Sequence, residues 1–225
     1  MTDIKTLIKQ VHQEAKKEDF PIDTLIYQEA KKDPLEPVLY AGNLASQLCF
    51  FGRDLGRDEV YAGQPLIGAA GRMVREGFFQ AWQGRKSHDR QELLSVCDRI
   101  FLTNTVPYKP PGNKAYSGEV KDRFRPFIEK LLVFYWQGDH IIPLGTEAFK
   151  WFEPYGKPKE VDKFYLDKER FTKKLLVTLT ATDEDGLKQQ KKVTLLPLPH
   201  PSPLNQRYYA LFPDLLQKRL TEFAF

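Results

Sequence analysis

Apolar positions near both ends of the chain recur at helical spacing. Those between Ile4 and Ala15 follow the i, i+3, i+4 pattern of an amphipathic helix, and Asp3 precedes them as a candidate N-cap. A second helix is predicted over residues 22–31, before two prolines that end it. The same spacing predicts a closing helix over residues 215–223. These segments are expected to pack on a domain that lies between them.

The middle of the chain alternates between apolar runs of strand length and helical spacing. Helices are predicted around residues 73–78, 120–135 and 148–152. Strands in alternation with helices are typical of a parallel sheet that is covered on both faces. We therefore expect the α/β class, as a three-layer αβα sandwich around a short central parallel β-sheet. The predicted strands are residues 48–51, 100–103, 141–144 and 193–198.

Two further stretches complete the predicted fold. Residues 175–180 form another strand-like run, and Asp185-Gly186 is a turn signal between this run and the last strand, so either a β-hairpin or a long loop fits. The charged, irregular segment 154–170 is interpreted as surface. We divide the chain into an N-terminal helical extension packed on the core, residues 1–40, and a single domain, residues 41–225.

Composition is that of an ordinary globular protein. The 225 residues are 41% hydrophobic, enough to bury a sizeable core. The sequence contains no apolar run of membrane-spanning length, and its start lacks the apolar centre of a signal peptide. We therefore expect a cytoplasmic protein without a membrane partner, or a nuclear one in a host with a nucleus.

Charge and cysteine content narrow the chemistry. A net charge of +4 and a pI near 8.9 permit a polyanionic partner without requiring one. Cys49 and Cys97 lie in apolar surroundings, which predicts buried free thiols in a reducing compartment. Two cysteines cannot hold a metal centre with four thiolate ligands.

Polar residues stand directly after three of the predicted strands. Asp54 lies in a glycine-rich loop after the first strand, and Asn104 ends the second. His200 follows the last strand, in a loop that three prolines hold stiff. Each also has a simpler interpretation, as a loop-capping Asp, a turn-forming Asn or a turn His. The glycine loop matches neither GxGxxG nor GxxxxGK[ST], which disfavours a nucleotide cofactor.

The three loops are informative together. Because the carboxyl ends of parallel strands meet at one edge of a sheet, Asp54, Asn104 and His200 are expected to share one crevice. GRDLG, LTNTV and HPSPLN resemble the GQDPY, LLNTV and HPSPLS loops of the uracil-DNA glycosylase superfamily. The likeness covers roughly residues 48–207. The iron-sulfur branch of that superfamily is similar over longer patterns: GxxxGxDExxxGxPxxGxAG from Gly52, TNxVxxxPPGN from Thr103 and IIPLG from Ile141.

The resemblance implies a role for each residue of the crevice. Breaking the bond between deoxyribose and uracil builds positive charge on the sugar and negative charge on the base. Asp54 would orient the attacking water and offset the cationic sugar, and His200 would donate to the uracil oxygen. Asn104 would pair with the flipped base through its amide.

Further residues are carried over from the same motifs. Leu66 and Gly52 would line the base site. Leu204 matches the apolar wedge that fills the gap left by the flipped base. The backbone near Ser202 would contact the sugar or phosphates. Lys109, among the basic residues able to meet phosphates, and Asn113 of the PPGN pattern are the remaining candidate DNA-binding residues.

Four positions depart from the family pattern. Leu66 stands where relatives stack a phenylalanine on uracil, which implies weaker stacking. Gly56 replaces the tyrosine that excludes thymine in the strict uracil enzymes, which opens the base range. Tyr108 replaces a cluster cysteine of the iron-sulfur branch, so we predict no iron-sulfur cluster, no other cofactor and no metal. Arg53 replaces Gln or Glu, with no interpretation from sequence.

We therefore predict a monomeric, monofunctional DNA glycosylase that removes uracil from DNA and starts base-excision repair. Other deaminated bases, such as hypoxanthine and xanthine, remain open as substrates. Two alternatives belong to other classes: a module that holds uracil-containing or damaged DNA without cutting it, and a metal-dependent nucleotide hydrolase that uses the glycine loop. Retention of Asp54 and His200 argues against the first, and the missing phosphate-binding lysine motif argues against the second.

Overall fold

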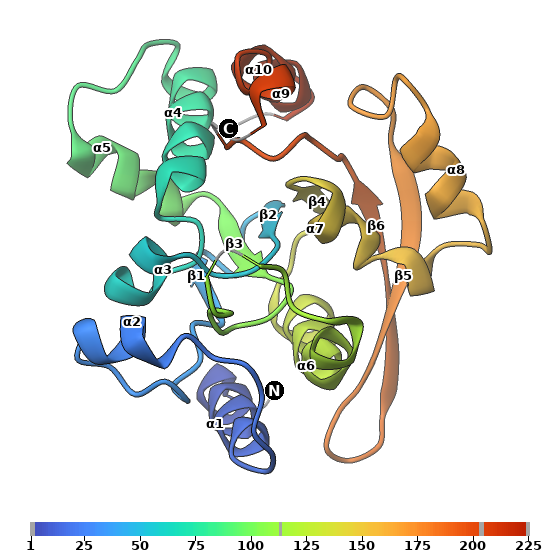
Figure 1. Cartoon of the computed structure of the whole chain (residues 1–225). Helices are drawn as coiled ribbons and strands as arrows, with labels where there is room; N and C mark the ends of the chain where they lie inside the picture. The colour runs from blue at the N-terminus through green and yellow to red at the C-terminus, as the bar shows by residue number, and fades with distance from the viewer. Residues whose placement is uncertain (1–2, 113, 203–204, 224–225) are drawn as a thin grey trace.

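The computed structural model describes residues 3–112, 114–202 and 205–223. Within them a six-stranded sheet runs through the middle, in the order β1-β3-β2-β4-β6-β5 (Figure 1). The four inner strands are parallel, whereas β1 and β5 pair antiparallel at the two edges. The predicted parallel sheet is thus confirmed at the centre, with antiparallel edges added. The strands are β1 Tyr40–Gly42, β2 Leu48–Gly52, β3 Phe101–Asn104, β4 His140–Pro143, β5 Leu175–Thr182 and β6 Lys188–Leu195.

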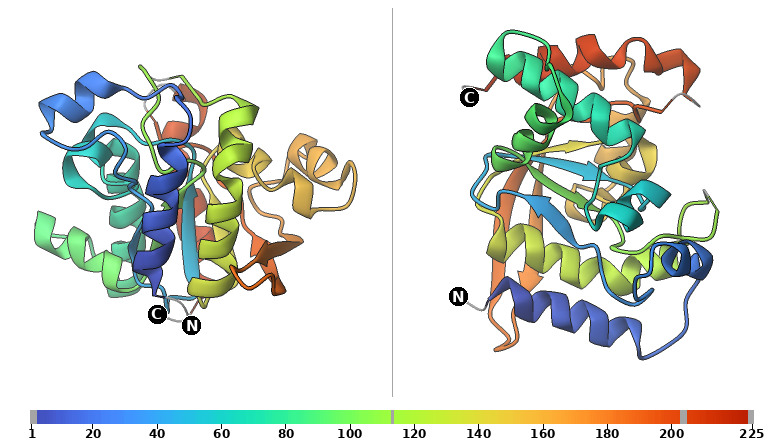
Figure 2. Two further views of the ribbon diagram at one scale, coloured as in Figure 1. Left: turned by 90° about the horizontal axis from the view of Figure 1, so that it is seen from below. Right: turned by 90° about the vertical axis from the view of Figure 1, so that its left-hand side faces the viewer.

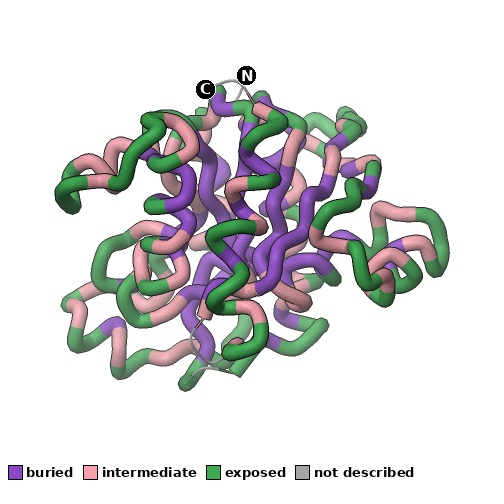
Figure 3. The backbone as a smooth tube through the Cα atoms, turned by 90° about the horizontal axis from the view of Figure 1, so that it is seen from above, coloured by how far each residue is buried: buried purple, intermediate pink, exposed green. Residues whose placement is uncertain are grey.

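Helices cover both faces of the sheet, so the molecule has three layers (Figure 2). The helices α1 (Ile4–Ala15) and α6 (Gly118–Lys130) lie on one face, and α4 (Ala69–Gln83) and α10 (Phe212–Leu220) lie on the other. The inner strand β2 is buried along its whole length because successive side chains enter the two apolar layers in turn. Buried residues are accordingly concentrated in the middle of the molecule (Figure 3).

The remaining helical elements are short. They connect the strands or lie at the margins of the two layers. In chain order they are α2 Thr24–Glu29, α3 Arg57–Ala62, α5 Arg90–Ser95, η1 Val96–Asp98, η2 Leu131–Tyr135, α7 Thr146–Lys150, η3 Glu153–Tyr155, α8 Glu160–Leu166 and α9 Gln206–Tyr209, of which η2 is a π-helical continuation of α6.

Strands β5 and β6 form a β-hairpin, which decides between the two interpretations of residues 175–198. Their register runs from Leu175 opposite Leu195 to Thr182 opposite Lys188. Gly186 adopts a φ of +81° in the turn, a conformation that favours glycine. The carboxylate of Asp183 accepts hydrogen bonds from two backbone amides of the turn, at 3.0 and 2.8 Å.

The N-terminal segment packs tightly on the domain. Asp3 caps α1 as predicted, with its carboxylate accepting from the amide of Lys5 at 3.1 Å. The apolar side of α1 is buried in the same cluster as α6. Strand β1 begins at Tyr40, so the division between residues 40 and 41 falls inside a strand of the sheet; as a boundary it remains a proposal. None of the described helices has the length and apolar character needed to span a membrane.

Four predictions differ from the structure. The last strand, predicted over residues 193–198, is β6, Lys188–Leu195. Helix α3 lies inside the glycine loop, and α8 lies in the segment expected to be irregular surface. Each buries only one side chain, Val60 or Val161, so neither leaves a periodic apolar pattern in the sequence. The expectation that both thiols are buried is wrong for Cys97, which is partly exposed because it lies in the marginal turn η1; Cys49 is buried in β2.

Candidate active site

A cleft of about 450 Å³ opens where the parallel strands end. Asp54 lies two residues beyond β2, and Asn104 is the last residue of β3. His200 enters from the loop after β6, which a parallel bridge between Leu144 and Leu198 ties to the end of β4. All three predicted residues line this one cleft, so their expected convergence is confirmed.

Asp54 is held by its neighbours through one carboxylate oxygen. The hydroxyl of Thr105 donates to Asp54 Oδ1 at 3.3 Å, and to the carbonyl of Arg53 at 2.6 Å. Asp54 Oδ2 is buried and has no hydrogen-bond partner among the described residues. Burial raises the pKa of the carboxyl, and the charges of Arg53 and Lys121 only partly oppose this. A raised pKa and a free oxygen suit a group that orients and deprotonates water.

The backbone carbonyl of His200 accepts two hydrogen bonds from residues that follow it. The donors are the amide of Ser202 at 2.9 Å and the side-chain amide of Asn205 at 3.1 Å. Burial, with a smaller contribution from the charge of Arg53, lowers the pKa of His200 to about 4. The imidazole is therefore neutral at physiological pH and offers one N–H donor.

Gly145, directly before α7, makes room for the histidine. It has a φ of +85°, and a Cβ at this position would lie 2.8 Å from Cβ of His200. Its amide donates to the carbonyl of Leu198 at 2.8 Å, which holds the two loops together. Close approach of these loops therefore requires glycine here.

The inner wall of the cleft is formed by Gly52, Asn104 and Leu66. A Cβ on Gly52 would lie 2.8 Å from Nδ2 of Asn104 and 3.3 Å from Cδ2 of Leu66, so the three positions are in direct contact. Asn104 is only 2% exposed, and its Oδ1 has no hydrogen-bond partner among the described residues. A buried amide oxygen without a partner costs about 1–3 kcal/mol, which is recovered when a ligand donates to it.

Leu66 is held in an unusual backbone conformation. Its φ is +52°, in the left-handed region that costs a non-glycine residue about 1–2 kcal/mol. The guanidinium of the buried Arg75 donates to the Leu66 carbonyl and stabilises this conformation. Gly71 packs so closely that a Cβ there would overlap the same carbonyl. The Leu66 side chain is thereby aimed at the cleft.

Glu59 organises the glycine loop and was missed by the sequence interpretation. Its carboxylate accepts from three backbone amides: Gly56 at 3.0 Å, Ile67 at 3.1 Å and Gly68 at 2.9 Å. These bonds tie the start of α3 to the start of α4 across the loop. The available signal was a Glu three residues after a possible N-cap, a pattern typical of helix starts.

A charged pair beside Asp54 was also missed. Lys121 on α6 donates to Glu147 on α7 at 2.5 Å. This pair lies next to the cleft, where the Lys121 charge acts on Asp54. Arg53 lines both the cleft and a neighbouring groove that contains Glu147, so the position that departed from the family pattern carries charge into the site.

The candidate DNA-binding residues lie in different environments in the structure. Ser202 lines the cleft as expected. Lys109 is 4% exposed, and its ammonium donates inside the protein, to Asp23 at 2.7 Å, to the carbonyl of Pro110 at 3.0 Å and to that of Gly112 at 2.8 Å. Its position indicates that it shapes the loop at the cleft rather than meeting a phosphate directly. Leu204 and Asn113 lie outside the described residues.

The residues present do not fit an iron-sulfur cluster. Tyr108, at the position of a cluster cysteine in the iron-sulfur branch, is buried and donates to the carbonyl of Leu35 at 2.9 Å. Cys49 and Cys97 pack into the two different apolar layers of the fold. No group of three or more His, Cys, Asp or Glu side chains in the described part of the chain is arranged to hold a metal ion. Clusters of this kind are held by four cysteines.

The protein is thus a three-layer α/β protein with a carboxylate, an amide and a neutral imidazole in one cleft at the carboxyl edge of its sheet. The chain belongs to the uracil DNA glycosylase superfamily, whose family model matches residues 39–224. It is 28% identical over 91 residues to the type-4 uracil-DNA glycosylase of Archaeoglobus fulgidus, covering 40% of each chain. It is 28% identical over 115 residues to that of Thermotoga maritima, covering 51% of this chain and 53% of the relative. The chain thus spans about half the length of these relatives, or less.

Proposed function

We propose that this protein is a monofunctional DNA glycosylase that hydrolyses the N-glycosidic bond of uracil in DNA. The observation that carries the proposal is the convergence of Asp54, Asn104 and His200 in one cleft of about 450 Å³. Membership of the superfamily and the names of the two relatives support it. A uracil turned out of the DNA stack would enter this cleft, because the bond to be broken is inaccessible inside a duplex.

Asp54 is proposed to act on the sugar side of the bond. Its free Oδ2 holds a water whose oxygen attacks C1′ of the deoxyribose, while the carboxylate charge offsets the positive charge that develops on the sugar. The C1′–N1 bond breaks and its electron pair leaves with uracil. The water keeps one proton on the new sugar hydroxyl, and Asp54 accepts the other. The raised pKa makes it a better base than an exposed aspartate.

His200 is proposed to act on the base side. Its neutral imidazole donates a hydrogen bond to the uracil oxygen on which negative charge accumulates as the bond breaks. A neutral donor stabilises the departing anion without giving up its proton, so no proton transfer from His200 is needed. The hydrogen bonds from Ser202 and Asn205 to the His200 carbonyl hold the donor in place before the reaction begins.

Asn104 is proposed to read the base. Its buried Oδ1 accepts from the N3–H of uracil, and its amide nitrogen donates to the adjacent carbonyl. Cytosine presents the reverse pattern at these positions and leaves the Asn104 oxygen unsatisfied. Discrimination between uracil and cytosine can therefore be large, since each buried polar group without a hydrogen-bond partner costs about 1–3 kcal/mol.

The base range is proposed to be wider than that of the strict uracil enzymes. Leu66 replaces an aromatic ring with a smaller apolar surface against the base. Gly56 has no side chain where a tyrosine would exclude bulkier bases, and an added Cβ would meet only the carboxylate end of Glu59, at 2.5 Å. Hypoxanthine and xanthine are the deaminated bases to be tested after uracil.

Base release tests the proposal directly. The substrate is a fluorescent oligonucleotide with one uracil, used single-stranded and opposite guanine or adenine, followed by alkali to cleave any abasic site. Wild type should release uracil, and Asp54→Asn and His200→Gln should each lower the rate by at least about 100-fold. Asp185→Asn, on the exposed hairpin turn, is the matched carboxylate control.

The alternative of a DNA-holding module has a distinct outcome in the same experiment. If wild type retains uracil-containing DNA more tightly than uracil-free DNA but releases no base, the protein is a binding module. If Asp54→Asn releases uracil at the wild-type rate, the role assigned to this carboxylate is wrong.

A further inference from the structure

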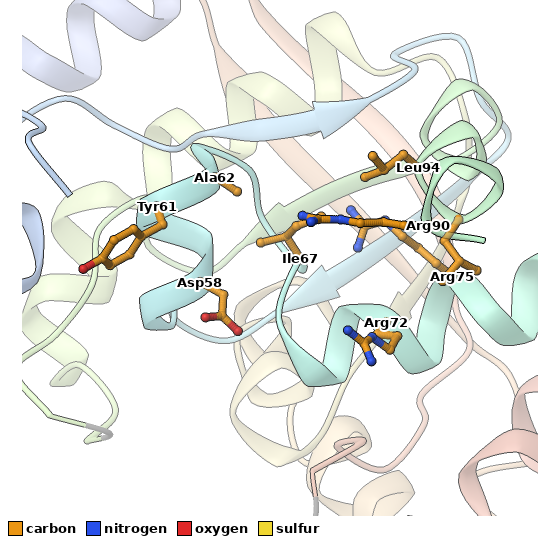
Figure 4. Close-up of a pocket in the computed structure, with 9 residues that line it drawn as sticks. Asp58, Tyr61, Ala62, Ile67, Arg72, Arg75, Arg90 and Leu94 are labelled. Carbon is orange, nitrogen blue, oxygen red and sulfur yellow. The ribbon is translucent and has the colours of Figure 1, made fainter.

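A second pocket of about 460 Å³ lies beside α3 (Figure 4). It is lined by residues of α3, of the N-terminal part of α4 and of α5. Asp58 on α3 borders both this pocket and the cleft, so the two cavities share a wall. No residue to which we assign a step of the proposed reaction lines it.

The pocket is strongly cationic. Arg72 and Arg75 from α4 and Arg90 from α5 line it, opposite the single carboxylate of Asp58 (Figure 4). Arg72 and Arg90 are exposed. Among the described residues, Arg57, Arg85, Arg123 and Arg125 make ion pairs, whereas the three arginines of the pocket make none.

Arg75 shows that this is more than a patch of surface charge. It is 2% exposed, and its guanidinium donates to the Leu66 carbonyl and contacts Sγ of Cys97 at 3.5 Å. Its Nε has no hydrogen-bond partner among the described residues. A buried guanidinium stays charged and is costly without a counterion, so an anion in the pocket would stabilise it.

The guanidinium groups that line the pocket can bind an oxyanion, because their planar forks match carboxylate and phosphate oxygens. A tetrahedral phosphate presents oxygens in several directions, so that more than one of these arginines can donate to it. We infer that the pocket lined by Arg72, Arg75 and Arg90 binds a phosphate group, supplied by the backbone of the DNA strand whose base occupies the cleft. The shared wall at Asp58 and the bond from Arg75 to the cleft residue Leu66 place the pocket next to the cleft that would hold the base of that strand. The DNA source rests on the proposed function, whereas the phosphate site itself does not.

Equilibrium binding tests the inference without using base release. Arg72→Gln, Arg90→Gln and the double variant are compared with Lys188→Gln, which removes one positive charge from the distant, exposed hairpin. Arg75 is left intact because its loss would also free the Leu66 carbonyl. Each variant carries Asp54→Asn, so that substrate is not consumed. Affinity for a uracil-containing duplex is measured between about 50 and 200 mM salt.

The double variant should bind the duplex about 10-fold more weakly at low salt and should reduce the slope of log affinity against log salt by about 0.9 for one lost phosphate contact. Lys188→Gln should leave the slope unchanged. A single neutral methylphosphonate linkage, moved along the strand, should weaken wild-type binding at one position and have no effect there in the double variant. That non-additivity would identify the phosphate.

A parallel titration distinguishes the source of the phosphate. In one outcome, inorganic phosphate or a 5′-mononucleotide raises the melting temperature of wild type but not of the double variant, while both proteins show the same slope of log DNA affinity against log salt. The pocket then binds a free phosphate, and the DNA source is wrong. If the double variant matches Lys188→Gln in both experiments, the phosphate site is refuted. A protein that shows the slope change but releases no uracil would contradict the proposed function and leave the phosphate site standing.

Discussion

Replacing Gly145 by alanine tests how strictly the fold positions His200. Gly145 has φ +85° and ψ 176°, a region that is essentially restricted to glycine, and an added Cβ would lie 2.8 Å from Cβ of His200. The amide of Gly145 also bonds the Leu198 carbonyl at 2.8 Å, so the loop cannot move away without losing that contact. Alanine must therefore displace the histidine loop.

The expected size of the effect follows from these two contacts. The backbone conformation alone costs alanine about 1–3 kcal/mol. Overpacking against His200 adds about 1–3 kcal/mol. For a chain of this length, each kcal/mol lowers the melting temperature by about 2–4 °C. A displacement of His200 by about 1 Å should lower the rate of base release by about 100-fold, because the donor no longer meets the uracil oxygen.

Gly84→Ala is the matched control. Gly84 ends α4 with φ +68°, but a Cβ there meets nothing within 4 Å. This variant has only the conformational cost, so it should melt slightly below wild type and release base at the wild-type rate. Both variants are assayed well below their melting temperatures, measured by circular dichroism. Equal rates for Gly145→Ala and Gly84→Ala would refute the argument that close packing at Gly145 positions His200.

Three further predictions concern the buried charges. Asp54→Asn should lose base release yet melt above wild type at pH 7, because burial raises the pKa of Asp54 and its ionisation destabilises the fold. This gain in melting temperature should shrink as the pH falls through that pKa. An unchanged melting temperature at pH 7 would contradict the prediction. His200, with a pKa lowered to about 4, binds a proton more readily when the chain is unfolded, so stability should fall as the pH drops from about 6.5 to 4. His200→Gln should reduce that loss when melting temperatures are measured over this pH range. Lys109→Met should lower the free energy of unfolding, measured in urea, by about 3–5 kcal/mol, because it leaves the Asp23 carboxylate without its ion-pair partner. Adding Asp23→Asn should restore part of the loss. If Lys109→Met alone is as stable as wild type, the ion pair is not needed for stability.

The sequence predicted well those elements whose buried side chains form a regular apolar pattern along the chain. The inner strands β2, β3 and β4 are short apolar runs buried on both faces, and α1, α6 and α10 each turn one apolar side to a layer of the core. Helices α3 and α8 bury one side chain each and leave no such pattern. Strand β1 is only three residues long and is defined by its pairing with β3.

The same distinction holds for the cleft. Asp54, Asn104 and His200 could be predicted because each lies within a few residues of the end of a predicted strand, and the ends of parallel strands must meet at one edge of the sheet. Glu59 could not be assigned its role, since its three amide partners belong to a loop whose path is irregular. For Lys109 the sequence suggested a DNA phosphate, whereas the fold surrounds its ammonium with Asp23 and two carbonyls.

By itself, then, the sequence determined the layers, the inner strands and the residue types at the cleft, because hydrophobic periodicity and residue order along the chain are local properties. Only the tertiary structure decided which charges meet. The pair of Lys121 with Glu147, the bond from Arg75 to Leu66 and the cationic pocket between α3, α4 and α5 join residues from separate elements. Burial and electrostatic interaction depend on distances in space, which no pattern along the chain records.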